Sequence, residues 1–155
     1  MASKSDLYEL NKTLKEASIT LHEDYHQKKY GLVATRGMRL LQEFMDFDRT
    51  FAPLRESVEV CCPIVSYTGQ SLEKLDAEDK AIELYSWIIH RGCMGTLPFT
   101  RLAILLERQS DYSGAIGVCD KAIENKWFYP STAKAAEVDF SKRKARLEKK
   151  MRQKK

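Results

Sequence analysis

Residues 96–129 read TLPFTRLAILLERQSDYSGAIGVCDKAIENKWFY, and this stretch decides the fold. Its first half spaces apolar residues three and four positions apart, as on one face of a helix; these are Phe99, Leu102, Ala103 and Leu106. Polar residues 109–112 interrupt the pattern, and a second helical pattern follows at Ala115, Cys119 and Ala122. The stretch predicts two helices joined by a tight turn. Such a pair cannot bury its apolar face alone, so it must stack on neighbouring helices.

This spacing resembles the tetratricopeptide repeat, a helical hairpin with a period of about 34 residues. One period upstream, Ala81 matches Ala115, and two further pairs keep the same step: Ile82 with Ile116, and Tyr85 with Cys119. We therefore interpret residues 96–129 as a complete repeat and residues 76–95 as a partial one, with a helix over 76–91 that Gly92 ends.

Two further helices are predicted near the start of the chain. Residues 6–27 place apolar side chains at helical spacing, namely Leu7, Leu10, Leu14, Ala17, Leu21 and Tyr25. After the polar break at 26–29, a second stripe comprises Tyr30, Val33, Gly37, Leu40, Phe44 and Phe47. This spacing predicts an antiparallel helical hairpin, which we interpret as a diverged repeat.

The segment 48–75 gives conflicting signals. Pro53 can open a helix and Pro63 should close it, so we predict a short helix over 53–62. Residues 67–70, Tyr-Thr-Gly-Gln, read as a loop. The positions that match the first helix of a repeat, Val65, Thr68 and Gly69, fall in or beside this loop. We therefore expect the upstream repeat to be distorted there.

The predicted fold is all-α, with stacked antiparallel helical hairpins that form a tetratricopeptide-like superhelix. Past Pro130, a narrowing apolar stripe predicts a final capping helix and comprises Ala133, Ala136, Phe140, Leu147 and Met151. Residues 1–141 are expected to form one domain, and residues 142–155 a basic helical extension whose last turns project into solvent or fray.

Composition narrows the classes of protein that fit. No apolar run approaches the roughly 20 residues that a membrane-spanning helix needs, and no secretory signal is visible, so we expect a cytoplasmic protein without membrane contact. The four cysteines lack paired metal-ligand spacing, and Cys119 occupies an apolar repeat position, so reduced thiols are expected. The sequence contains no glycine-rich phosphate loop or dinucleotide fingerprint, and we expect no cofactor.

The net charge of +4 is unevenly distributed. Residues 142–155 hold nine Lys or Arg against one Glu, which leaves the preceding 141 residues at −4. A basic segment of this kind can contact nucleic acid through its phosphates, without sequence specificity. The candidate polyanion contacts are Lys142, Arg143, Lys144, Arg146, Lys149, Lys150 and Arg152. A solvated terminal helix is the alternative interpretation.

Residues 22–26, His-Glu-Asp-Tyr-His, match the H-E-x-x-H pattern of zinc hydrolases. In that pattern His22 and His26 would bind zinc and Glu23 would act as general base, with Glu43 or His90 as possible third ligands. The surrounding charged residues are unlike those of such enzymes. We therefore interpret the match as coincidental and expect no catalytic activity.

The resemblance to tetratricopeptide proteins implies a binding function. In those proteins the first helix of each pair lines a groove for a protein or peptide partner. The matching positions here are Leu97, Thr100, Arg101, Ile104, Glu107 and Arg108. Only Arg101 fits the cluster that clamps a carboxylate terminus, so we expect an interaction scaffold without that clamp. Ile104 and Leu97 suggest an apolar groove, which a partner segment or another copy of the chain could fill. The chain's own N-terminal helices could equally fill it.

Overall fold

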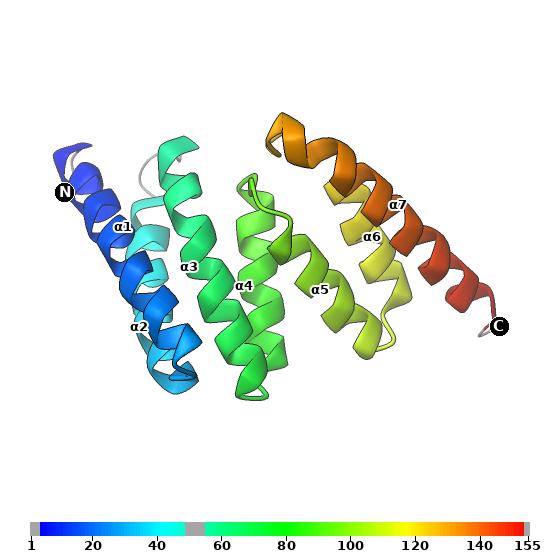
Figure 1. Cartoon of the computed structure of the whole chain (residues 1–155), viewed down its shortest axis with the longest axis horizontal. Coiled ribbons are helices and arrows are strands. Elements are labelled where there is room, and N and C mark those ends of the chain that lie inside the picture. Colours follow the sequence, from blue (N-terminus) through cyan, green and yellow to red (C-terminus); the bar gives the residue numbers. More distant parts are fainter. Residues whose placement is uncertain (1–3, 49–54, 154–155) are drawn as a thin grey trace. The chain divides into compact units, whose positions relative to one another are not determined.

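The computed structural model describes residues 4–48 and 55–153, and all regular structure in these residues is helical. Figure 1 shows the helices in chain order: α1 Lys4–His26, α2 Tyr30–Asp48, α3 Arg55–Lys74, α4 Glu78–His90, α5 Leu97–Arg108, α6 Tyr112–Ile123 and α7 Pro130–Gln153. They pack mostly in consecutive pairs. The prediction of an all-α protein built from sequential helical pairs is confirmed.

The helices fall into two compact units, residues 1–84 and residues 85–155, and α4 contributes to both. Each unit has its own buried side chains. Within the described ranges, no helix combines the length and the apolar character that crossing a membrane requires.

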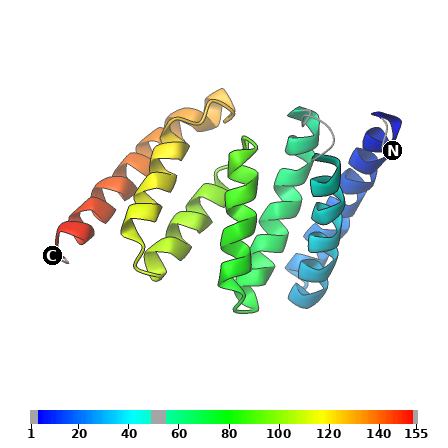
Figure 2. The ribbon, with the colours of Figure 1, turned by 180° about the vertical axis from the view of Figure 1, so that it is seen from behind.

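In the first unit, α1, α2 and α3 each pack against the other two, and Figures 1 and 2 show them side by side from both directions. The apolar faces of these helices form the core, in which Leu14, Val33 and Ile64 are fully buried. A buried hydrogen bond of 3.0 Å, from Asn11 Nδ2 to Ser57 Oγ, joins α1 to α3. The predicted stripe of the second helix is confirmed up to Phe44.

An acidic residue fixes the hairpin between α1 and α2. Asp24 is buried, and its carboxylate accepts a hydrogen bond of 3.3 Å from Arg36 Nη1 on α2. Lys29 Nζ lies 3.9 Å from the same carboxylate. A buried carboxylate requires such partners, because leaving it unpaired would cost several kcal/mol. The charge pairs therefore link the end of α1 to the turn and to α2.

The helix α3 differs from the prediction. It runs through Pro63 to Lys74 without a break, and Val65, Thr68 and Gly69 are buried within it. Pro63 is exposed, so the carbonyl of Glu59 that loses its helical hydrogen bond lies on the solvent side, where water can replace it. The predicted loop and the predicted helix end are wrong, and the predicted start at Pro53 lies outside the described residues.

Three helical hairpins close with the same turn. The residues Lys28, Asp76 and Ser110 have positive φ angles of 61°, 59° and 61°, which L residues adopt rarely. At the third turn, the Ser110 N–H donates to the Glu107 carbonyl and the Asp111 N–H donates to the Leu106 carbonyl, both at 2.9 Å. The other two turns repeat this hydrogen-bond pattern, which is the Schellman motif.

In the second unit, α6 packs against both α5 and α7. Phe99 on α5 is the central residue, since its ring lies edge-on 5.2 Å from Phe128 and 6.2 Å from Phe140 on α7. Asp111 caps α6 by accepting a hydrogen bond of 2.9 Å from the Gly114 N–H. Leu147 is fully buried, so the basic end of α7 packs on this unit as far as that residue, whereas Met151 and Arg152 in the last turn are exposed.

Candidate functional site

A cavity of about 530 Å³ opens between α5 and α7 in the second unit. The helix α7 supplies most of its wall, because Thr132, Ala136, Asp139, Arg143 and Arg146 recur at intervals of three and four residues along one helix face. Thr96 and Thr100 line the opposite side, at the start of α5. We call this cavity the α5–α7 groove.

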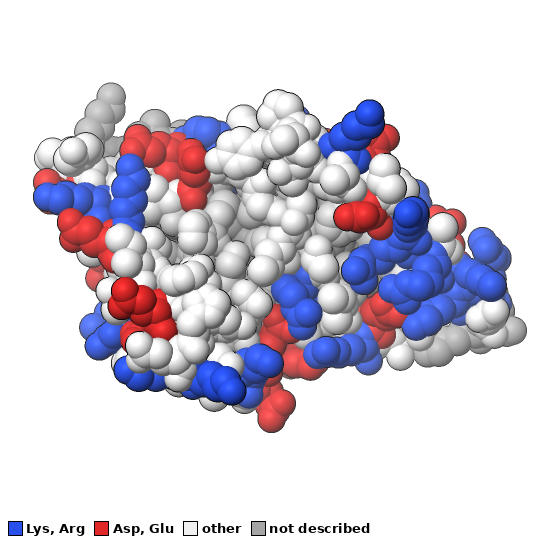
Figure 3. Space-filling model, in the orientation of Figure 1, with Lys and Arg blue, Asp and Glu red and all other residues white. Residues whose placement is uncertain are grey.

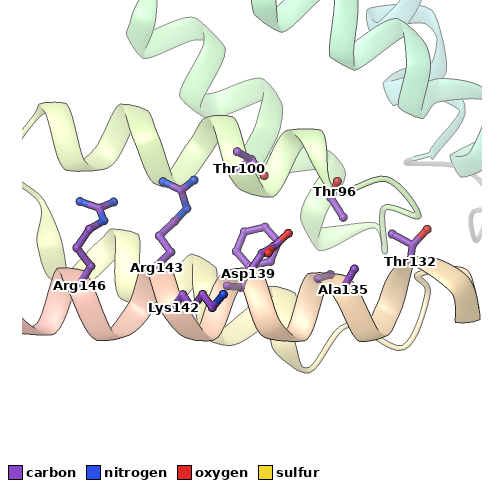
Figure 4. Close-up of a pocket in the computed structure, with 10 residues that line it drawn as sticks. Thr96, Thr100, Thr132, Ala135, Asp139, Lys142, Arg143 and Arg146 are labelled. Carbon is purple, nitrogen blue, oxygen red and sulfur yellow. The ribbon is translucent and has the colours of Figure 1, made fainter.

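The groove has two chemically different ends, which Figure 4 shows along α7. Hydroxyl groups of Thr96, Thr100 and Thr132 line one end, and a hydroxyl can both donate and accept a hydrogen bond. Lys142, Arg143 and Arg146 line the other end. The arrangement can bind a polar segment that carries negative charge.

A carboxylate on α5 holds the cationic end in place. Glu107 accepts hydrogen bonds of 2.7 and 2.9 Å from the two terminal nitrogens of Arg146 and one of 2.6 Å from Lys150 Nζ. The hydrogen bond from Arg146 is the main cause that lowers the pKa of Glu107 from 4.5 to about 2; burial opposes this shift, and Lys150 adds to it. The guanidinium of Arg146 is thus already neutralised.

Arg143 is in a different position. Its side chain is half-buried and extends from α7 toward α5 in Figure 4. Within the described ranges it makes no hydrogen bond or ion pair. A guanidinium presents five N–H donors in a planar fork that matches a carboxylate or phosphate group. Arg143 is therefore the groove residue that is best placed to bind an anionic group.

The resemblance to tetratricopeptide proteins implied six groove residues, and the structure does not bring them together. Only Thr100 lines the groove, and Glu107 is bound to the cations of α7. Arg108 is exposed, whereas the other three, Leu97, Arg101 and Ile104, are half-buried. The predictions missed Thr132 and Asp139 and assigned Arg143 only to the tail. The spacing of these residues along one face of the final helix was the available signal.

The basic segment is only partly available for polyanions. Figure 3 shows Lys and Arg gathered toward the C-terminal part of α7, with Asp and Glu among them. Lys144 Nζ lies 2.7 Å from Asp120 on α6, while Arg146 and Lys150 bind Glu107. The remaining candidates, Lys149 and Arg152 with Lys142, are exposed and form no ion pair in the part of the chain that the structure describes. Polyanion binding by this segment stays a prediction.

The H-E-x-x-H residues lie at the end of α1. His22, Glu23 and His26 are exposed, with the two imidazole centroids 4.4 Å apart, and His22 Nδ1 forms a hydrogen bond with the Tyr67 hydroxyl. Among residues 4–48 and 55–153, no group of three or more potential metal ligands gathers. Catalytic zinc sites use three protein ligands, whereas this arrangement offers two imidazoles. The interpretation of this match as coincidental stays a prediction, and zinc hydrolysis stays its alternative.

Comparisons of the chain with protein-family models, with curated proteins and with solved structures found no match.

Proposed function

We propose that this chain is a non-catalytic interaction module of the tetratricopeptide type, which binds a segment of a partner protein in the α5–α7 groove. The observation that carries the proposal is the half-buried guanidinium of Arg143, directed into the groove without a described ionic partner. The partner segment would place an acidic side chain on Arg143 and polar groups against the threonine hydroxyls.

The repeated turn supports the tetratricopeptide interpretation. The turn residue Ser110 follows the turn residue Asp76 by 34 positions, which is the period of that family. The same step relates buried helix positions: Val65 with Phe99, Thr68 with Leu102, Gly69 with Ala103, and Ala81 with Ala115. The upstream first helix, which the sequence did not predict, thus keeps the register of the repeat.

The arrangement of α5, α6 and α7 also fits this function. In a stack of helical pairs, the first helix of one pair and the first helix of the next lie side by side, as α5 and α7 do through Phe99 and Phe140. The groove between them has a volume of about 530 Å³, within the usual range of ligand-binding clefts. A bidentate hydrogen bond between Arg143 and a carboxylate would give both affinity and orientation.

Selection from a displayed library of random peptides tests the proposal. We expect the selected sequences to be enriched in Asp and Glu, and their affinity to fall by about tenfold or more for Arg143→Glu, because a charge-assisted hydrogen bond is replaced by repulsion. Thr100→Val should weaken the same peptides by a smaller factor. Lys134→Glu is the matched control, since Lys134 is an exposed cation of α7 outside the groove.

Two results would contradict the proposal. One is a selection that yields no peptide with binding sensitive to Arg143→Glu. The other is an equal loss of binding for Arg143→Glu and Lys134→Glu, which would indicate attraction to the overall charge of α7. Circular dichroism of each variant separates loss of binding from loss of folding.

A further inference from the structure

One carboxylate lies among the hydroxyls and cations of the α5–α7 groove. Asp139 lines the groove between Thr132 and Arg143, and its side chain is exposed. Among the residues that the structure describes, this carboxylate forms no hydrogen bond or ion pair. Figure 4 shows it on the side of α7 that faces α5. The groove therefore offers a ligand a negative charge as well as the positive charge of Arg143.

Helix geometry fixes the spacing of these two charges. Asp139 and Arg143 are four residues apart on α7, so they share one helix face and lie about 6 Å apart along the axis. An ion pair between such neighbours on an exposed helix face contributes little free energy. A ligand can therefore engage both charges without first breaking a stable contact.

The groove is long and narrow. Its lining on α7 runs from Thr132 to Arg146, which corresponds to about 21 Å of helix at 1.5 Å per residue. A volume of about 530 Å³ over this length gives a mean cross-section of about 25 Å². A helix with its side chains is about 10–12 Å across and would need a cross-section of about 80–110 Å². The groove thus fits an extended segment and not a helix.

An extended segment can reach both charges with two side chains on the same side. Successive side chains of a strand point to opposite sides, and the chain rises about 3.3 Å per residue. Side chains two positions apart therefore lie about 6.6 Å apart on one side, which matches the spacing of Asp139 and Arg143. The two complementary residues of the ligand would thus be separated by a single residue.

We propose, building on the proposed function of the groove, that it selects an extended partner segment in which one acidic and one basic residue are separated by a single residue. The acidic side chain binds Arg143, and the basic side chain binds Asp139. A phosphorylated segment is a poorer match, because Asp139 repels additional negative charge one helical turn from Arg143. Asp139 therefore makes the groove selective against polyanionic segments.

The test uses end-blocked heptapeptides with Glu fixed at the centre and all other positions random, retained on the immobilised full chain and then sequenced. We expect Lys and Arg to be enriched by about twofold to fivefold at one position, two residues from the fixed Glu, which is the range for an exposed ion pair. Asp139→Asn should abolish this enrichment. Glu137→Gln is the matched control and should keep it, since Glu137 is an exposed carboxylate of α7 outside the groove.

Exchanging the two charges gives a sharper readout. In the double variant Asp139→Lys with Arg143→Glu, the fixed Glu binds at the other end, so the enriched basic position should move to the opposite side of Glu. A second library with phosphoserine in place of Glu should be retained better by Asp139→Asn than by the parent chain, because the repelling carboxylate is removed. Circular dichroism verifies that each variant is folded.

The outcomes separate this proposal from the proposed function. Retention that falls in Arg143→Glu without enrichment of Lys or Arg two residues from Glu would overturn the charge pattern and leave the groove as a peptide site. Retention that is insensitive to Arg143→Glu would overturn both. Enrichment that persists in Asp139→Asn, or equal retention of the phosphoserine library by Asp139→Asn and the parent, would overturn the role of Asp139.

Discussion

Arg146 on α7 and Glu107 on α5 form a two-pronged ion pair, with nitrogen-to-oxygen distances of 2.7 and 2.9 Å. The pair spans 39 residues of sequence and is reinforced by Lys150 one helical turn further on. It attaches the basic end of α7 to the helix that forms the opposite wall of the groove. The contact therefore links the two walls of the groove.

The pair should make stability depend on pH. Folding lowers the pKa of Glu107 from its ordinary value of 4.5 to about 2. The ionised form of this side chain therefore favours the folded state. The contribution is complete above pH 4.5 and is lost as the pH falls toward 2. Because Arg146 and Lys150 are both about half exposed, we expect the ion pair to contribute only about 1–2 kcal/mol to the free energy of unfolding. Urea unfolding should show Glu107→Gln less stable than the parent by this amount at pH 7, and the difference should shrink at pH 3. An undiminished difference at pH 3 would refute the assignment.

The close approach of α2 to α3 should make Gly37 sensitive to substitution. A Cβ atom added at Gly37 would lie 2.9 Å from the Cβ of Thr68 and nearer still to its hydroxyl. We expect Gly37→Ala to lower the free energy of unfolding by about 1–3 kcal/mol, and the added change Thr68→Ala to restore part of it. Gly31→Ala is the control on the same helix, because nothing lies within 4 Å of its new Cβ. A Gly37→Ala variant as stable as Gly31→Ala would contradict the observed contact.

Removing the proline inside α3 should stabilise the first unit. Pro63→Ala restores a helical N–H that can donate to the Glu59 carbonyl and removes the steric clash of the ring. The substitution also makes the unfolded chain more flexible, which offsets part of the gain. We therefore expect the free energy of unfolding, measured in urea, to rise by about 1–2 kcal/mol. Pro130→Ala should give no such gain, because Pro130 is the first residue of α7, a position that favours proline. Equal effects of the two substitutions would argue against an interior proline in α3.

The cysteines should differ in reactivity. Cys61, Cys93 and Cys119 are fully buried, and burial raises the pKa of the Cys119 thiol, whereas Cys62 is half-buried. Brief treatment of the folded protein with iodoacetamide should therefore modify Cys62 first, as read by peptide mass spectrometry. The other three should react at comparable rates only in denaturant. Early modification of Cys119 would contradict its place in the core.

The local spacing of apolar residues was sufficient to predict most of the helices. The apolar stripes of α1 and α2 and of α4 to α7 follow the helical period, and residues such as Leu14, Ala81 and Phe99 are buried as those stripes require. At Cys119 the prediction of a small buried side chain is confirmed. A regular apolar stripe predicts which side chains of a helix are buried, because the apolar face of the helix packs on its neighbours.

The helix α3 could not be predicted in this way. Pro63 and Gly69 are local signals against a helix, yet both lie within one. The burial of Thr68 depends on Gly37, which allows α2 to approach α3 closely. That contact joins residues 31 positions apart, so no pattern within α3 itself could indicate it.

The groove was predicted only in part, for a similar reason. The sequence assigned every cation after Ser141 to one basic segment. In the structure some of these cations form ion pairs and others do not. Arg146 and Lys150 pair with Glu107, and Lys144 pairs with Asp120. Which cation stays unpaired is decided by acidic residues on other helices. The spacing of Arg143 could place it on one face of α7, but its lack of an acidic partner could be recognised only once the three helices were assembled.

The turns at Lys28, Asp76 and Ser110 share one backbone conformation and have three different side chains. Two main-chain hydrogen bonds hold each turn, and any residue other than proline can supply them. The recurrence of this hairpin is thus encoded in main-chain geometry and in the order of buried and exposed positions. Sequence identity can decay at such positions while the hairpin persists. Related hairpins are better sought by aligning turn positions and burial than by matching residue types.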